Sequence, residues 1–364
     1  MLLQKPAFLL FYHTRAAEAS FGEWLGVLWH GLSLDCTVAG YVTAFPVVVV
    51  LASFWIPLSQ RVWRIILTVY FSLIALVTAA IFAVDLNLYG YWGFRLDGSV
   101  LIYLADPGEA LASASWGEVL RQIIIMLVYA GAMIWSYRRI LRLFRVEPVS
   151  LRGRIVPTVA ALLIGGLTFL AIRGGVTVAT ANVSKVYFSS NMFLNHAATN
   201  PVFSFLSSVG DNENYAEAYP FFEEERRKTL FEELRGNRPG ADAGTPRLLR
   251  SDRPNVVLIL LESFGRTIMD ETVNGEPVMP NMQRFKREGV WFENFFANSF
   301  RTDRGQVAVL CGFPAQTTMS IMKLPRKSAT LPSLARSLGR EGYRSVFMYG
   351  GDLNFTNQAS FMYS

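Results

Sequence analysis

Five residues in the last third of the chain have side chains that could act together in catalysis. Glu262 follows the apolar run NVVLILL, Thr302 lies within NSFRTDRGQVAVL, and Asp352 follows two glycines. A carboxylate is a natural ligand for Mg²⁺ or Mn²⁺. A threonine hydroxyl can act as a nucleophile where a helix dipole and a metal stabilise its alkoxide. Arg301 and Arg304 flank Thr302 and could hold an anionic phosphate.

Each of these residues also has a structural interpretation. A Glu after a buried strand is often simply solvated, and an Asp after two glycines usually shapes a turn. A Thr between a strand and a helix is most often an N-cap. The surrounding pattern must therefore decide whether these side chains meet.

That pattern alternates between strands and helices from residue 253 onwards. The run 255–261 is continuous, apolar and β-branched, as in a buried parallel strand. Further strands are expected at 290–297 and 344–349, and helices at 282–288, 304–310 and 331–341. This alternation predicts an α/β domain with a parallel sheet, in which chemistry lies at the carboxyl ends of the strands.

The composition indicates a membrane protein. Hydrophobic residues make up 52% of the 364 residues and charged residues only 17%. The mean hydropathy is +0.29, which is unusual for a soluble chain. Two cysteines exclude a disulfide-stapled scaffold, and three histidines leave little for a histidine metal site. Apolar stretches predict membrane spans at about 37–60, 64–84, 119–137 and 155–172.

Arginines between these stretches predict the orientation of the protein in the membrane. They also explain the net charge of +6, so the charge does not indicate a nucleic-acid-binding protein. The loops 61–64 and 138–154 are rich in arginine and should lie inside. The segment 85–118 carries five acidic residues against one arginine and should lie outside, as should everything after about residue 173. We therefore expect a multi-pass protein of the plasma (inner) membrane with its C-terminal domain outside the cytoplasm.

The sequence divides into three regions. Residues 1–172 form the transmembrane domain, in which 1–12 are interpreted as the remnant of a first span. Residues 173–252 are an extracytoplasmic linker with amphipathic helices, and 253–364 are the N-terminal part of an α/β domain.

Three motifs in this arrangement resemble one family. They are FSSNMFLNHAATNP at 188–201, FANSFRTDRG at 296–305 and GFPAQ at 312–316. With the membrane helices, the chain resembles the lipoteichoic acid synthase-like family of membrane-anchored, sulfatase-like phosphoglycerol transferases. The resemblance implies an alkaline phosphatase/sulfatase-like α/β domain.

The resemblance also implies roles for the residues. Glu262 would be a metal ligand, Thr302 both ligand and covalent nucleophile, and Asp352 would lie near the substrate headgroup, with Arg301 and Arg304 binding phosphate. The cofactor would be a divalent metal, Mn²⁺ in preference to Mg²⁺ or Zn²⁺. A phosphoglycerol-type headgroup would pass from a membrane phospholipid to a glycan or polymer acceptor through a phospho-threonine intermediate.

The sequence departs from the family in its metal site. The superfamily completes that site with an Asp-His pair and a further His, whereas this chain has no histidine after His196. The α/β domain is therefore expected to be truncated at its C-terminus, and the chain as it stands to bind Mn²⁺ poorly and to be inactive. The histidine expected beside the Gly-Asp is also absent, which weakens phosphoglycerol as the substrate.

Two other functions remain open. One is a phosphoethanolamine transferase or another phosphoesterase of the sulfatase superfamily, although such transferases usually have a disulfide-rich catalytic domain. A true sulfatase needs a Cys or Ser within C-x-P-x-R, and the proline after Cys311 comes one position late. The second is a non-catalytic membrane protein that only binds a glycan or a partner.

Overall fold

The computed structural model describes residues 2–98, 100–101, 115–145, 150–209, 221–235, 251–316 and 319–364. The chain divides into two compact units. The first contains residues Met1–Asn212 and Val307–Ser364, and the second contains Glu213–Gln306.

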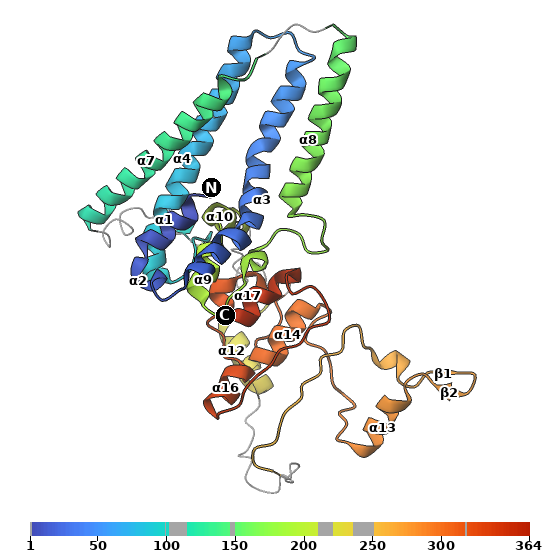
Figure 1. The fold of residues 1–364 in the computed structure, drawn as a ribbon. Helices are drawn as coiled ribbons and strands as arrows, with labels where there is room; N and C mark the ends of the chain where they lie inside the picture. Colours follow the sequence, from blue (N-terminus) through green and yellow to red (C-terminus); the bar gives the residue numbers. More distant parts are fainter. Residues whose placement is uncertain are drawn as a thin grey trace. The chain divides into compact units, whose positions relative to one another are not determined.

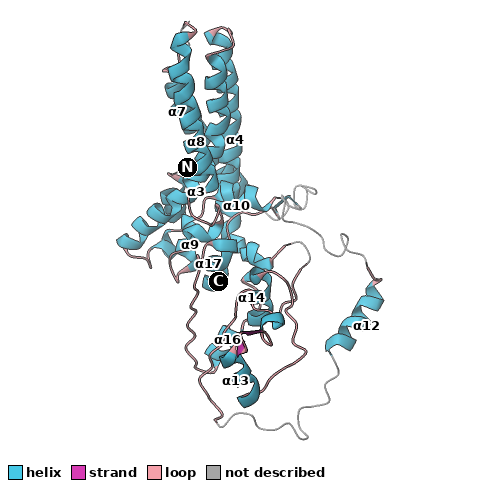
Figure 2. Cartoon of the chain, turned by 90° about the vertical axis from the view of Figure 1, so that its right-hand side faces the viewer, coloured by secondary structure: helices cyan, strands magenta, loops and turns pink. Residues whose placement is uncertain are grey.

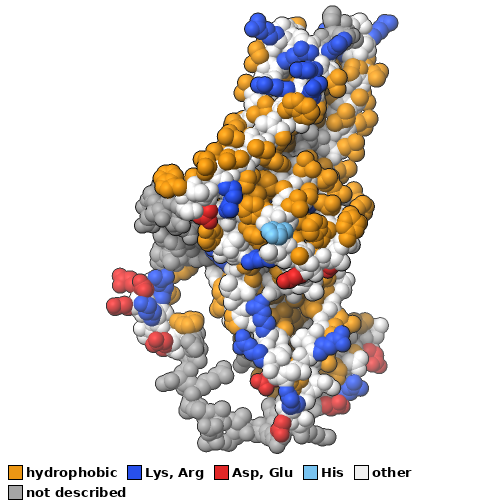
Figure 3. Space-filling view, turned by 60° about the vertical axis from the view of Figure 1, so that its left-hand side comes forward, with side chains coloured by type: hydrophobic (Ala, Val, Ile, Leu, Met, Phe, Trp, Pro, Cys, Tyr) orange, Lys and Arg blue, Asp and Glu red, His pale blue; other side chains and the backbone are white. Residues whose placement is uncertain are grey.

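Four long helices dominate the first unit (Figure 1). They are α3 (Phe21–Ser53), α4 (Gln60–Trp92), α7 (Trp116–Leu141) and α8 (Ile155–Arg173), the last preceded by the 3-10 turn η1 (Arg152–Arg154). All four are long and apolar enough to cross a membrane. α4 packs along α7 and α3 packs along α8. Hydrophobic side chains cover much of the helical surface visible in Figure 3, as expected for helices that face lipid.

The ends of these helices differ from the expected spans. The first expected span, 37–60, is wrong as a single helix, because α3 ends at Ser53 and α4 begins only at Gln60. α3 instead starts at Phe21, where the Ser20 side chain accepts the backbone N–H of Glu23 and the Glu23 carboxylate accepts that of Ser20. Counting only uncharged residues missed this start, because α3 contains Asp35.

Two buried ion pairs explain how acidic residues fit inside apolar helices. Asp35 in α3 accepts hydrogen bonds from Lys5 Nζ at 2.6 Å and Asn200 Nδ2 at 2.7 Å. Asp85 in α4 lies 3.1 Å from Arg95 Nη2 and accepts the backbone N–H of Leu96 at 2.9 Å. All of these partners lie outside the long helices, so the pairs attach neighbouring segments to the bundle.

Those segments form a helical cap at one end of α3 and α4. It consists of α1 (Gln4–Phe11), α2 (His13–Ala16), α9 (Met192–Ala198), α10 (Pro201–Ser208) and the 3-10 turn η2 (Val183–Val186). Its core is aliphatic and aromatic, with Phe8, Leu194 and Val27 fully or almost fully buried. Asn195 accepts the backbone N–H groups of Phe188 and Ser189, which folds the linker motif back on α9.

His196 in α9 is buried in this cap and should make stability pH-dependent. Its Nδ1 lies 3.1 Å from the Tyr89 hydroxyl. Burial lowers the pKa of His196 to about 3, and the charge of Arg95 acts in the same direction. The unfolded chain titrates near its ordinary value of about 6.5, so below that pH it binds a proton that the folded protein excludes. The free energy of unfolding should therefore fall by about 1.4 kcal/mol for each pH unit between about 6.5 and 3.

Thermal unfolding of wild type and His196→Gln in detergent at pH 7, 6, 5 and 4.5 tests this effect. The glutamine cannot titrate, so the variant should lose stability less steeply than wild type as the pH falls. Parallel curves would show that other groups carry the acid sensitivity.

Residues 307–364 also belong to the first unit. They form η4 (Ile321–Lys323), α15 (Pro325–Ser328), α16 (Leu334–Arg340), η5 (Phe355–Asn357) and α17 (Gln358–Tyr363). Asn182 Nδ2 donates to the carbonyl of Asn354 at 2.7 Å, and the Ser360 N–H donates to Ser184 Oγ at 3.0 Å. The helix expected over 331–341 is shorter and occupies Leu334–Arg340.

The second unit is small and loop-rich (Figure 2). It contains α12 (Glu224–Arg235), η3 (Arg266–Ile268), β1 (Thr272–Val273), β2 (Glu276–Pro277), α13 (Pro280–Glu288) and the start of α14 (Thr302–Cys311). β1 and β2 pair antiparallel around Asn274 and Gly275, both with positive φ. Asn-Gly favours such a turn.

The expected parallel sheet is not present among the described residues, where β1–β2 is the one sheet. The segments 255–261, 290–297 and 344–349 are not strands, and Val257 and Ile259 are 83% and 70% exposed. A strand exists only where a neighbour accepts its hydrogen bonds and covers its apolar face. The sequence pattern predicts the preference of one segment, whereas pairing depends on a second one.

Candidate active site

Glu262 and Thr302 meet within the second unit, although they lie 40 residues apart in the sequence. The threonine Oγ1 lies 2.7 Å from Glu262 Oε1 and 2.6 Å from Oε2. Both carboxylate oxygens therefore share the single hydroxyl proton. The pair lies at the surface, where a substrate could approach it.

Two local features place these side chains. Glu262 follows the extended run 255–261 and enters a turn with Ser263, whose φ of 53° is positive. Few residues other than glycine adopt this conformation. Thr302 is the first residue of α14, so its hydroxyl lies at a helix N-terminus.

The direction of the Thr302 hydrogen bond distinguishes it from a helix cap. A capping side chain accepts a backbone N–H from the first turn. Thr302 Oγ1 instead donates its proton to Glu262. That bond increases the electron density on the threonine oxygen, and the positive end of the helix dipole favours negative charge beside it.

The two side chains fit part of a site for a hard divalent ion. A carboxylate and a hydroxyl are oxygen donors of the kind that Mg²⁺ and Mn²⁺ prefer, and they already converge. Over the described ranges, no group of three or more His, Cys, Asp and Glu side chains gathers to hold a metal. Glu262 and Thr302 would thus supply two of the six or so ligands that such an ion needs.

The two arginines beside Thr302 differ from each other. Arg301 Nε lies 3.5 Å from Asp303 Oδ1, and its side chain is 48% exposed. It can therefore reach an anion in solvent. Arg304 is 8% exposed, and its guanidinium lies over the Phe300 ring at 5.6 Å. Asp303, which the sequence analysis did not single out, is buried and helps to hold Arg301, and no spacing pattern marks it.

Asp352 belongs to the first unit, whereas Glu262 and Thr302 belong to the second. Its Oδ1 accepts the backbone N–H of Asn354 at 2.9 Å, which closes a turn. Lys185 interacts with it electrostatically, which opposes the lowering of the Lys185 pKa by burial. These contacts fit the structural interpretation of Asp352, and its position near a headgroup stays a prediction.

Comparison with known proteins identifies the region around this pair. Residues 254–364 match the sulfatase family. This sulfatase domain includes Glu262, Thr302 and Asp352. The match confirms the resemblance expected from the motifs for residues 254–364.

Two curated relatives support the same assignment. Over 120 residues the chain is 36% identical to phosphoglycerol transferase I of Xanthomonas campestris pv. campestris (strain B100), covering 31% of this chain and 17% of that protein. Over 117 residues it is 33% identical to lipoteichoic acid synthase 1 of Bacillus subtilis (strain 168), covering 29% and 17%. The chain thus spans about 17% of the length of the relatives it matches. No solved structure matches it.

Together with the sulfatase domain, the four apolar helices point to an inner-membrane protein. The domain and its relatives support a transferase of the sulfatase superfamily.

Proposed function

We propose that the protein is a membrane-anchored, metal-dependent transferase. It moves a phosphoglycerol-type headgroup from a membrane phospholipid to an envelope glycan or polymer. The observation that carries this proposal is the Thr302–Glu262 hydrogen bond inside the sulfatase domain. The names of the two relatives, a phosphoglycerol transferase and a lipoteichoic acid synthase, support the substrate class.

In the first half of the reaction, the Thr302 oxygen attacks the phosphorus of the lipid headgroup. Its proton passes to Glu262, which already accepts it in a hydrogen bond. The bond between phosphorus and the diacylglycerol oxygen breaks, and diacylglycerol leaves with a proton taken from solvent. Threonine then carries the phosphoglycerol group as a phosphodiester.

In the second half, an acceptor hydroxyl attacks the same phosphorus and loses its proton to solvent. The bond between phosphorus and the Thr302 oxygen breaks, and Glu262 returns to that oxygen the proton it accepted, which restores the Thr302–Glu262 hydrogen bond. Arg301 can pair with the phosphate oxygens during both steps, because its guanidinium is half exposed beside Thr302. A bound divalent ion would add electrostatic stabilisation of the alkoxide and of the phosphoryl oxygens.

The proposed orientation puts the sulfatase domain outside the cytoplasm, where lipid headgroups and envelope glycans are both accessible. The arginine-rich loops 61–64 and 138–154 support it, since such loops stay on the cytoplasmic side.

A labelling experiment tests both the intermediate and the orientation. Spheroplasts that produce the intact protein are supplied from outside with a short-chain phosphatidylglycerol labelled in its glycerol headgroup. Peptide mapping should find the label on Thr302, and a Thr302→Ala protein should remain unlabelled. Label on another residue, or none at all, would contradict the intermediate. Labelling that requires permeabilised cells would contradict the orientation.

A further inference from the structure

The end of the helical bundle that joins α3 to α4 and α7 to α8 is strongly basic. Figure 3 shows Lys and Arg side chains gathered at the upper end of the helices, with no acidic side chain among them on that face. The described residues 54–72, 130–145 and 150–165 contain no Asp or Glu. They contain eight arginines: Arg61, Arg64, Arg138, Arg139, Arg142, Arg145, Arg152 and Arg154.

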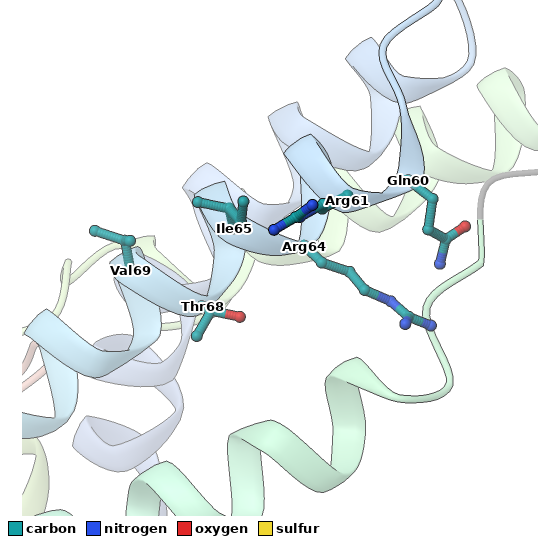
Figure 4. A pocket seen from close by; sticks show the side chains of 6 residues that line it. All are labelled: Gln60, Arg61, Arg64, Ile65, Thr68 and Val69. Atoms are coloured by element: carbon teal, nitrogen blue, oxygen red, sulfur yellow. The ribbon is translucent and has the colours of Figure 1, made fainter.

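A pocket of about 500 Å³ opens at this end, and residues of one helix line it (Figure 4). The lining residues come from the first three turns of α4: Gln60, Arg61, Arg64, Ile65, Thr68 and Val69. None of the candidate active-site residues lines this pocket.

Hydrogen bonds to the segment after α7 hold two of the side chains that line the pocket. Gln60 Nε2 donates to the Phe144 carbonyl at 2.6 Å, and Arg64 Nη2 donates to the same oxygen at 3.2 Å. Behind them, Trp63 and Leu67 pack with Leu141 in a small apolar core. The pocket is thus preformed, which lowers the entropy cost of binding.

Hydrogen-bonding capacity remains in the pocket. Arg64 Nε is buried and lacks a hydrogen-bond partner within the structure as described. Arg61 is exposed and forms no hydrogen bond or ion pair with any residue that the structure describes. The two side chains point to different sides of α4 in Figure 4, so Arg61 is the group that can bind an anion from solvent, while Arg64 adds positive charge beside it and the N-terminus of α4 adds a favourable dipole.

The polarity of the pocket changes along the helix. Arg61, Ile65 and Val69 follow one another at four-residue spacing, so they lie on one face. Ile65 and Val69 are 52% and 64% exposed, and they lie further along α4 than the arginines. α4 is about 50 Å long at 1.5 Å per residue, longer than a hydrocarbon core of about 30 Å. The excess length leaves room for its first turns, which carry Arg61 and Arg64, at the headgroup level, with the apolar residues that follow beside the upper acyl chains.

We propose that this pocket binds an anionic phospholipid. The lipid phosphate would pair with Arg61, the charge of Arg64 would add to the attraction, and one acyl chain would lie along Ile65 and Val69. A phospholipid, whose phosphate is followed by an acyl chain, fits the pocket better than a free phosphate. A free phosphate would make no contact with the apolar half of the pocket. The site lies at the arginine-rich end of the bundle, so by the charge rule it would hold a lipid of the cytoplasmic leaflet. The proposal does not depend on the transferase activity.

Basic loops attract anionic membranes in a general way, and the experiment must separate that effect from a site. Arg152 provides the matched control, because it is an exposed arginine at the same end of the bundle and does not line the pocket. Arg61→Gln and Arg152→Gln remove the same charge, and neither removes a packing contact of the core.

Native mass spectrometry of the full chain in detergent can measure the binding of phosphatidylglycerol and phosphatidylcholine. Wild type should prefer phosphatidylglycerol by about tenfold. Arg61→Gln should weaken phosphatidylglycerol binding by about fivefold, the effect of one surface arginine, and Arg152→Gln by less than twofold. Ile65→Ser should also weaken it, and glycerol phosphate should not compete.

Three results would overturn the proposal. Equal losses in the two arginine variants would indicate diffuse attraction, and equal affinity for the two lipids would exclude a phosphate site. Competition by glycerol phosphate as strong as that of the lipid would indicate a free-phosphate site. Circular dichroism of each variant checks that its helices are intact.

Discussion

Replacement of Thr302 by alanine should lower transfer of the lipid headgroup by more than about a thousandfold in the intact protein. The hydroxyl oxygen is the atom proposed to form the bond to phosphorus, and alanine has none. The effect on folding should be small, because Thr302 lies at the surface end of α14 and its side chain donates to Glu262 instead of capping the helix. Membrane insertion and the helical circular dichroism signal should therefore be unchanged. The measurement is the release of diacylglycerol from labelled phosphatidylglycerol by purified protein.

Thr302→Ser is the matched control, since it keeps the hydroxyl and should retain activity within about tenfold. Glu262→Gln removes the charge that accepts the hydroxyl proton and should also be strongly impaired. Normal turnover by a folded Thr302→Ala protein would show that the threonine is structural and would refute the mechanism. Loss of activity in the serine variant as well would point to packing of the threonine methyl group.

Replacement of Asp85 by alanine should destabilise the fold by about 3–5 kcal/mol. Asp85 is fully buried in α4, where it pairs with Arg95 at 3.1 Å and accepts the Leu96 backbone N–H. Alanine would leave the Arg95 guanidinium buried without its counter-charge, over the ring of Phe8. The measurement is the free energy of unfolding in detergent. If the destabilisation is too large for the variant to fold, the protein should no longer be expressed.

Two further variants separate the ion pair from a general loss of charge. Asp97→Ala removes a partly exposed carboxylate 3.9 Å from Arg326 and should cost no more than about 1 kcal/mol. The double replacement Asp85→Leu with Arg95→Met should recover most of the stability, because it removes both charges and keeps the volume. A stable Asp85→Ala protein would mean that solvent reaches Arg95.

Several features could be predicted from the sequence because they depend on local preferences. The apolar stretches predict four membrane helices, since hydropathy is a property of a segment and not of its neighbours. The motif FANSFRTDRG predicts the relationship to sulfatases, and it contains Thr302. The helix after Thr302 was expected over 304–310 and occupies Thr302–Cys311. Thr302 and Glu262 were both candidates on the strength of their positions after expected strands.

Contacts between distant residues could not be predicted in this way. The sequence pattern does not show that Glu262 accepts the Thr302 hydroxyl, because the distance between them depends on the path of the 39 residues that separate them. Nor does it show that α3 extends back to Phe21, because a buried Asp35 is tolerated only where Lys5 lies beside it. The apolar run 255–261 predicts a strand, yet it remains unpaired because hydrogen bonds and burial require a second segment. Local preference can be read from one stretch of chain, whereas pairing, burial of charge and the geometry of a site depend on which stretches the fold brings together.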